Sequence, residues 1–294
     1  MSSLDFMWLE LTNQCNLSCN HCYADSGPEA GDQDILTLDD YCRLLDEGFD
    51  AGCRHVQFIG GEPTLFADLP FLIGHARKRG FSGIAVFSNL IRLSEAQITS
   101  FRVHDVSVST SVYGPTADVH ELITLRQGSF DRTMKNISRL VNSGVHVRAG
   151  FIETDLNVGA FGATDRFLRG LGLTEIGFDG VREFGRGKAG DSSILDSLCG
   201  ECAGKTLAVS SAGLASPCVL SRDWSFGSVL ETPLSDLLAS SRLAELRSEI
   251  RAATSRKSDM SNCYPDHSNP NCVPNAPCGP DAVCGPKCQP IFLS

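Results

Sequence analysis

Short apolar runs alternate with amphipathic segments from residue 6 to about residue 178. The runs are rich in β-branched and aromatic residues, which is typical of strands. We expect six strands, at Phe6–Leu11, His55–Ile59, Gly83–Phe87, Val106–Val112, Val145–Phe151 and Glu175–Phe178. Alternating strands and helices predict an α/β fold built from β/α units around a parallel sheet. Six units are too few to close an eight-stranded barrel, so we expect an open, partial (β/α)6 barrel.

Local signals mark the helices that connect these strands. Thr37 is placed to cap one helix, and Ser94 with Gln97 makes the capping box of another. A third helix is expected to begin at Ser129 and to close at Gly144, because glycine is common just beyond a helix end. The sequence therefore supplies helix starts and stops where the alternating pattern requires them.

The character of the chain changes beyond residue 190. The segment from Cys263 to Pro290 contains seven of the thirteen prolines and five of the thirteen cysteines. Proline at this density excludes helices and central strands. Bound metal orders small cysteine-rich modules of this kind, because bonds from ligand to metal replace the missing apolar burial. We therefore predict two domains, residues 1–190 and residues 191–294.

Composition narrows the range of functions. The 294 residues are 42% hydrophobic, and 25 basic against 35 acidic side chains give a net charge of −10. This sign argues against a nucleic-acid partner, because phosphate backbones attract basic surfaces. No apolar run reaches the ~18 residues of a membrane span, and the N-terminus lacks a signal-peptide pattern. We expect a cytoplasmic protein that does not bind membranes.

Thirteen cysteines in a reducing compartment indicate metal or redox chemistry. Three of them, Cys15, Cys19 and Cys22, follow the first predicted strand with the spacing C-x3-C-x2-C. Such thiolates can hold three irons of a 4Fe-4S cluster and leave the fourth iron open to a substrate. Zinc is the alternative, but it needs a fourth ligand, and the position of His21 suits solvent exposure better than ligation. A c-type haem is excluded, because no histidine follows the Cys19 and Cys22 pair.

A second group of residues, Gly60, Gly61, Glu62 and Pro63, ends the second predicted strand. Glycines there let backbone groups approach a small ligand closely, although they also suit a simple tight turn. Together with the three cysteines, this GGEP sequence resembles the radical S-adenosylmethionine superfamily. The resemblance implies that the cysteine loop binds the cluster, that the GGEP backbone holds the methionyl amino group, and that Tyr23 lies near the adenine.

Other polar residues extend this resemblance. Asn89 ends the third predicted strand, and Ser109 and Ser111 lie on one face of the fourth, as strand alternation requires. Their polar groups would reach the ribose or the carboxylate of the cofactor. Arg126 is the arginine best placed to pair with a carboxylate, although an ordinary surface role stays open. The fourth strand ends Ser-Val-Tyr-Gly, so the aspartate of the commoner family sequence SLDG is absent. Weaker candidates are Arg148, Asn157, Arg182 and the segment Gly185-Arg186-Gly187.

The C-terminal cysteines resemble the auxiliary-cluster module called SPASM, found after the radical domain of peptide-modifying enzymes. They are Cys199, Cys202, Cys218, Cys263, Cys272, Cys278, Cys284 and Cys288. Eight cysteines suffice for two fully ligated 4Fe-4S clusters. The family's pairing implies one cluster on Cys199, Cys202, Cys218 and Cys288 and a second on the other four. Five residues rather than two separate Cys272 from Cys278, so the partition stays open, and a pair of structural zinc sites is the alternative.

The resemblance implies a function. A low-potential donor such as a ferredoxin or a flavodoxin would reduce the first cluster, which would cleave S-adenosylmethionine to a 5′-deoxyadenosyl radical. The radical would take a hydrogen atom from an unactivated carbon, and the auxiliary clusters would then remove an electron. This chemistry suits the oxidative cross-linking of a ribosomally made precursor peptide. Because the first strand begins near residue 6, we expect a separate protein to recognise the leader of that peptide.

Three alternatives stay open. A peptide epimerase needs a thiol hydrogen donor, for which Cys42, Cys53 or a C-terminal cysteine outside the clusters would have to serve. Cys42 and Cys53 are both interpreted as small buried apolar residues. A small-molecule enzyme, acting for example on a tetrapyrrole, would use the same radical. A non-catalytic iron–sulfur or zinc protein serving electron transfer or assembly is the third, but such a protein has no use for the GGEP sequence.

Overall fold

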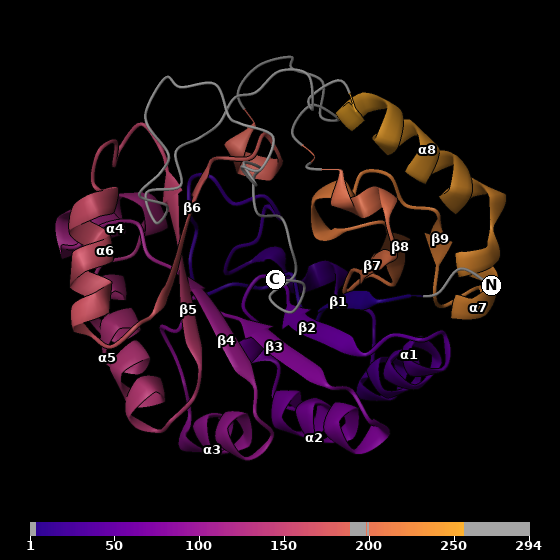
Figure 1. Cartoon of the computed structure of the whole chain (residues 1–294), viewed down its shortest axis with the longest axis horizontal. Coiled ribbons are helices and arrows are strands. Elements are labelled where there is room, and N and C mark those ends of the chain that lie inside the picture. The colour runs from indigo at the N-terminus through magenta and orange to yellow at the C-terminus, as the bar shows by residue number, and fades with distance from the viewer. Residues whose placement is uncertain (1–3, 189–197, 199, 256–294) are drawn as a thin grey trace, which may run out of the picture.

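One continuous sheet forms the centre of the protein (Figure 1). The computed structural model describes residues 4–188, 198 and 200–255. The sheet has nine strands in the order β6-β5-β4-β3-β2-β1-β7-β8-β9. The strands are β1 (Phe6–Glu10), β2 (His55–Ile59), β3 (Gly83–Phe87), β4 (Ser107–Ser111), β5 (Val147–Glu153), β6 (Glu175–Gly180), β7 (Thr206–Val209), β8 (Leu214–Ser216) and β9 (Gly227–Ser228). Strands β1 to β6 are parallel and neighbour one another in chain order, which confirms the predicted partial (β/α)6 barrel.

Helices cover the outer side of the curved sheet (Figure 1). They are α1 (Leu38–Asp50), α2 (Leu69–Arg79), α3 (Glu95–Val103), α4 (Ala117–Thr124), α5 (Ser129–Asn142), α6 (Phe161–Gly170), α7 (Leu234–Ala239) and α8 (Ser241–Ser255). The predicted cap at Thr37 and the predicted capping box of Ser94 with Gln97 are both formed, at the starts of α1 and α3, and Thr37 also makes a capping box, with Asp40. None of the helices in the described residues is long and apolar enough to cross a membrane.

Two strands begin later than their hydrophobicity predicts. Val106 and Val145 are buried, but each precedes its strand. Their N–H groups donate to carbonyl oxygens in the last turn of the preceding helix, that of Val106 to Phe101 and that of Val145 to Leu140. A backbone N–H has one hydrogen to donate, so these two N–H groups bond to the end of the preceding helix instead of pairing with a neighbouring strand.

The chain beyond residue 200 continues the same sheet, which the sequence pattern does not predict. Strand β7 pairs in parallel with β1, on the side of β1 that faces away from β2. Strands β8 and β9 then add antiparallel pairs, and α7 and α8 follow. The predicted domain boundary near residue 190 stays a prediction. Strand β1 pairs with β2 on one side and with β7 on the other, so one sheet contains strands from both predicted domains.

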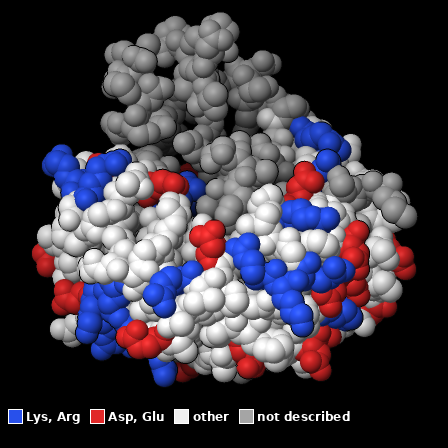
Figure 2. Space-filling model, turned by 60° about the horizontal axis from the view of Figure 1, so that its bottom comes forward, with Lys and Arg blue, Asp and Glu red and all other residues white. Residues whose placement is uncertain are grey.

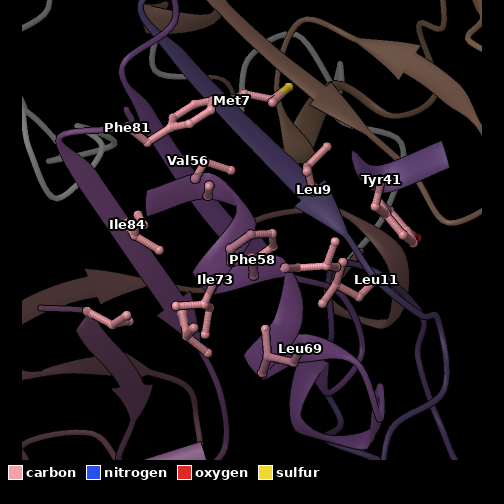
Figure 3. Close-up of a cluster of buried hydrophobic side chains, with 14 of the residues drawn as sticks. Met7, Leu9, Leu11, Tyr41, Val56, Phe58, Leu69, Ile73, Phe81 and Ile84 are labelled. Atoms are coloured by element: carbon pink, nitrogen blue, oxygen red, sulfur yellow. The ribbon is translucent and has the colours of Figure 1, made fainter. Parts of the chain in front are cut away.

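Apolar side chains from alternate strand positions pack beneath the helices (Figure 3). Met7 and Leu9 of β1 lie beside Phe58 of β2 and Ile84 of β3, all of them fully buried. The intervening residues of β1, Phe6 and Trp8, belong to a second cluster on the opposite face. Side chains on both faces of the sheet are therefore buried, as in other parallel sheets.

The apolar side chains between the sheet and the helices form the outer core. We expect Phe58→Ala to lower the free energy of unfolding by about 3–5 kcal/mol, because it leaves a cavity in this outer core. Phe71→Ala is the matched control: Phe71 is 57% exposed on α2, and its removal should cost below about 0.5 kcal/mol. Denaturant titration followed by circular dichroism measures both values. Equal losses in the two variants would contradict this view of the core.

Candidate active site

The loop after β1 carries the three predicted cluster ligands. Cys15 is 8% exposed, and Cys19 and Cys22 are half-buried. The thiols lie close enough for their charges to interact, since the charge of Cys22 raises the pKa of both Cys15 and Cys19. No group of three His, Cys, Asp or Glu side chains in the described residues is arranged to hold a single metal ion. A 4Fe-4S cluster makes a different demand, because each thiolate binds its own iron.

The electrostatics of this loop suit a bound cation. Burial is the main cause that raises the pKa of Cys15 and of Cys19 to about 12, and the charge of Glu62 contributes at Cys15. Thiolates, which are the ligand form, are therefore costly here without a positive partner. Irons would supply that charge, so the cysteines fit the cluster.

The two glycines of GGEP let the cysteine loop approach β2. A Cβ on Gly61 would lie 2.3 Å from the carbonyl oxygen of Gln14, and one on Gly60 would lie 2.4 Å from that of Thr12. Gly60 also has a φ of +145°, which side-chain-bearing residues rarely adopt. The Gly61 N–H donates to the Thr12 carbonyl at 2.7 Å. These glycines therefore position the loop, whatever they contribute to a ligand.

Glu62 organises the neighbouring strand ends. Its carboxylate is fully buried and accepts hydrogen bonds from Thr64 Oγ1 at 2.6 Å, Ser88 Oγ at 2.7 Å and the Asn89 N–H at 2.8 Å. Burial nevertheless raises its pKa. Pro63 opens the short 3-10 turn Pro63–Leu65 that follows. The network ties the end of β2 to the end of β3.

Asn89 connects this network to the cysteine loop. Its side-chain Nδ2 donates to Asn16 Oδ1 at 2.7 Å and lies 3.6 Å from the sulfur of Cys15. Hydrogen bonds to ligating sulfurs tune the potential of iron–sulfur clusters. The role predicted for Asn89 in binding the cofactor itself stays a prediction.

Three arginines donate to backbone carbonyls of the cysteine loop. Arg126 reaches the carbonyl of Asn16, Arg186 reaches those of Cys19 and Ser26, and Arg222 reaches that of Ala24. The loop has no regular structure there, so these carbonyls depend on such partners. Of the three, sequence reasoning named Arg126 for a different purpose, ranked Arg186 low and missed Arg222.

The segment around Arg186 packs directly on the loop. The Arg186 N–H donates to the Cys22 carbonyl at 3.0 Å. Gly185 has a φ of +52°, and a Cβ there would lie 2.4 Å from the same carbonyl oxygen. The glycine-arginine-glycine sequence was the available signal: one glycine allows close approach, and the arginine supplies donors.

The inner face of β4 and β5 carries polar side chains toward the interior of the barrel. Ser109 pairs in register with Arg148, and Ser111 pairs with Gly150, so these side-chain positions share one face. The adjoining positions on the other face, Val108 and Ala149, are fully buried in the outer core. Arg148 is half-buried and has no ion-pair partner among the described residues. This face therefore offers a hydroxyl and a cation to an anionic ligand.

Some buried polar atoms of the cysteine loop and of β4 have no hydrogen-bond partner among the described residues. Ser109 Oγ, His21 Nε2 and the Tyr23 hydroxyl make no hydrogen bond to described residues. Such atoms cost free energy unless a ligand or water satisfies them, so they fit a bound cofactor. The expectation that His21 is solvent-exposed is wrong: it is half-buried, and its ring lies 5.0 Å from that of Tyr113. Burial lowers its pKa.

Tyr113 is a site residue that the sequence reasoning did not select. It is 6% exposed. Burial is the main cause that raises its pKa, and the charges of Cys19, Cys22 and Cys15 add to the increase. It stands at the end of β4, where the family aspartate was found to be absent. The signal that could have identified Tyr113 was an aromatic residue directly after β4, in the place of the family aspartate.

Two of the cysteines predicted to bind an auxiliary cluster lie near Tyr23 of the cysteine loop. Cys202 and Cys218 belong to one buried cluster, against which Tyr23 packs. Tyr23 also lies 5.5 Å from the guanidinium of Arg222. The other predicted auxiliary ligands, Cys199, Cys263, Cys272, Cys278, Cys284 and Cys288, lie outside the described residues. Their partition between clusters stays a prediction.

Comparison with known proteins settles the family. A family model described as the radical SAM superfamily matches residues 9–167, which is more than half of the chain. The chain belongs to the radical SAM superfamily. A second model, described as an iron-sulfur cluster-binding domain, SPASM, matches residues 199–268. Both predicted resemblances are therefore confirmed, together with the 4Fe-4S clusters and S-adenosylmethionine as the cofactors to be expected.

Two curated relatives of this radical SAM chain come from Bacillus subtilis. The antilisterial bacteriocin subtilosin biosynthesis protein AlbA is 29% identical over 181 residues, covering 61% of this chain and 40% of AlbA. The sporulation killing factor maturation protein SkfB is 28% identical over 279 residues, covering 83% of this chain and 67% of SkfB. The chain thus spans less than half the length of AlbA.

The structure of Streptococcus suis SuiB bound to S-adenosylmethionine is similar in fold. The TM-score is 0.71 at 15% sequence identity, covering 84% of this chain and 68% of SuiB. SuiB has also been solved bound to precursor peptide SuiA. At this identity the likeness shows the fold alone.

We expect Arg186→Ala to reduce iron bound by the radical SAM site, because it removes the donors that hold the Cys19 and Ser26 carbonyls. Anaerobic reconstitution should leave the variant up to about four irons short of the parent chain, the content of one cluster. Arg166→Ala is the control, since Arg166 is exposed on α6. Full iron content in Arg186→Ala, measured with the 410-nm absorbance, would refute the assigned role.

Proposed function

We propose that this chain is a radical S-adenosylmethionine enzyme that oxidatively modifies a ribosomally made peptide, forming a cross-link. One observation carries the proposal: the three thiols of the cysteine loop lie near Tyr113 at the end of β4, the strand whose inner face presents the unpartnered Ser109 hydroxyl beside Arg148 of β5. When bound, the cluster and S-adenosylmethionine supply a radical that takes a hydrogen atom from an unactivated carbon.

In this proposal, residues of the chain bind and orient the cluster and S-adenosylmethionine. Cys15, Cys19 and Cys22 hold the cluster, and the GGEP backbone holds the methionyl group. Ser109 and Ser111 contact the ribose or the carboxylate of S-adenosylmethionine. Arg148 is the better candidate for pairing with that carboxylate, because the guanidinium of Arg126 donates to the Asn16 carbonyl.

The peptide substrate is supported by the names of the relatives. AlbA is named for bacteriocin biosynthesis, SkfB for maturation of a killing factor, and SuiB was solved with a precursor peptide. A low-potential electron donor and a separate leader-recognition protein complete the proposal as partners.

The placement of Cys42 and Cys53 supports cross-linking over an epimerisation that would use either of these two thiols. An epimerase needs a thiol that donates a hydrogen atom to the substrate. Cys53 is fully buried in the outer core, where its thiol donates to the His55 carbonyl, and Cys42 packs against that same core from α1. Neither thiol faces the interior of the barrel.

Reduced with dithionite and given S-adenosylmethionine, the reconstituted protein should release 5′-deoxyadenosine slowly without substrate. Alanine at Cys15, Cys19 or Cys22 should abolish release, because three thiolates are needed to hold the cluster. Cys42→Ala should release it at the parent rate. Chromatography of the quenched reaction measures the product. No release from protein with a full cluster content would favour a non-catalytic electron-transfer role.

Peptide product should lose two hydrogen atoms, about two mass units, per modified site. One atom leaves with 5′-deoxyadenosine; the other leaves as a proton and an electron, the electron passing to an auxiliary cluster. Mass spectrometry should therefore find no product from the Cys202→Ala, Cys218→Ala variant, although 5′-deoxyadenosine still forms. A product that keeps its mass in water and gains one deuterium in deuterated water would instead establish epimerisation.

A further inference from the structure

A basic cavity lies outside the site already described. It has a volume of about 450 Å³ and lies between the loop that follows β3 and helix α5. Five basic side chains line it, and no acidic side chain does: Arg92, Arg126, Arg132, Lys135 and Arg139. The inner-face residues Ser109 and Arg148 do not contribute to its lining.

The charge of this cavity is largely uncompensated. Arg139 is paired with Glu95 at 2.6 Å, and Arg126 is engaged with the Asn16 carbonyl. Arg92, Arg132 and Lys135 are exposed and have no ion-pair partner in the described part of the chain. Figure 2 shows several basic patches on one side of the molecule, with acidic groups at their edges. In a chain of net charge −10, such a group attracts an anionic partner locally.

The wall between the cavity and Cys15 is one layer of side chains. Asn16 lines the cavity and directly follows Cys15. Ile91 also lines it, and Ile91 packs with Cys15 and Leu17 in one buried cluster. Asn89 bridges Asn16 and the Cys15 sulfur. A partner seated in the cavity would therefore be separated from Cys15, a predicted cluster ligand, by Asn16 and Ile91.

We propose that this cavity is the docking site for the electron donor, a small acidic protein that carries a low-potential flavin or iron–sulfur centre. The inference rests on the proposed function, because only a cluster that must be reduced needs such a partner. In the encounter the donor loses one electron and the cluster gains one; no bond forms or breaks. Charge complementarity raises the association rate, and the overall negative charge of this chain would otherwise repel an acidic donor.

The position of the cavity favours a donor over an acidic segment of the peptide substrate. The reacting carbon must reach the inner face that carries Ser109 and Arg148, which are separate from the cavity lining. An electron needs only a short path to Cys15, and the cavity provides one. A donor docked there also leaves the interior of the barrel open to the peptide.

The test reverses two charges on α5, Arg132→Glu with Lys135→Glu. Both side chains are exposed and without described partners, so the fold should be retained. The matched control reverses one lysine and one arginine elsewhere, Lys78→Glu with Arg102→Glu, exposed near the ends of α2 and α3. Titration calorimetry measures binding of a bacterial flavodoxin and of a bacterial ferredoxin, and chromatography measures 5′-deoxyadenosine.

We expect the α5 variant to bind its donor at least about tenfold more weakly than the control variant, and salt to weaken parent binding. Formation of 5′-deoxyadenosine should fall with the protein donor and stay at the parent level with dithionite. Equal donor binding by the two variants, or no donor binding by the parent protein, would overturn the docking site. The docking site would also be overturned if the α5 variant bound hexaglutamate more weakly than the control variant did while both bound the donor equally. That result would assign the cavity to an acidic peptide.

The two proposals fail separately. If the parent protein forms no 5′-deoxyadenosine even with dithionite, the proposed function fails, and the binding measurements still decide the docking site. If the α5 variant loses dithionite-driven turnover as well, these residues act on the site itself and the docking proposal is wrong.

Discussion

Hydrogen bonds from three arginines to the backbone of the cysteine loop are the interactions on which the site depends. The loop that presents Cys15, Cys19 and Cys22 has no helix or strand to satisfy its carbonyls. Arg126, Arg186 and Arg222 donate to them from positions 110, 167 and 198 residues further along the chain. An unsatisfied buried carbonyl costs roughly 1–3 kcal/mol, so the loop keeps this shape only when the rest of the chain has folded around it.

The same arginines set the charge around the thiols. Burial is the main cause that raises the pKa of Cys19, and repulsion by the charges of Cys22 and Cys15 adds to it. Arg186 lowers that pKa, opposing the effect of burial. Fixed cations beside an iron–sulfur cluster also change its potential, because the net charge of the site is one of its determinants. Structure and redox tuning therefore come from the same contacts.

An ion pair between Arg222 and Glu10 connects the end of β1, which leads into the cysteine loop, to the segment that contains Cys218. Arg222 donates to the carboxylate of Glu10 at 2.5 Å, and Glu10, at the end of β1, is 5% exposed. Arg222 also lies over the ring of Tyr23, which packs against the cluster containing Cys218. Such a pair adds little net stability, because desolvation offsets the attraction. We infer that it fixes the position of the SPASM segment relative to the cysteine loop, as β7 does by pairing with β1.

Local features of the sequence determined the repeated β/α order and the helix caps, and they predict Cys15, Cys19 and Cys22 as the radical SAM ligands. β-branched runs form strands, capping residues satisfy the adjacent N–H groups, and the C-x3-C-x2-C and GGEP patterns each lie within a few residues. Only the tertiary structure decided that β7 joins β1, that Arg222 holds the cysteine loop and that Tyr113 lies beside its thiols. It also brought Arg92 next to α5 to make the basic cavity. These contacts join residues far apart along the chain, and their geometry depends on the packing of the whole sheet, which no local pattern encodes.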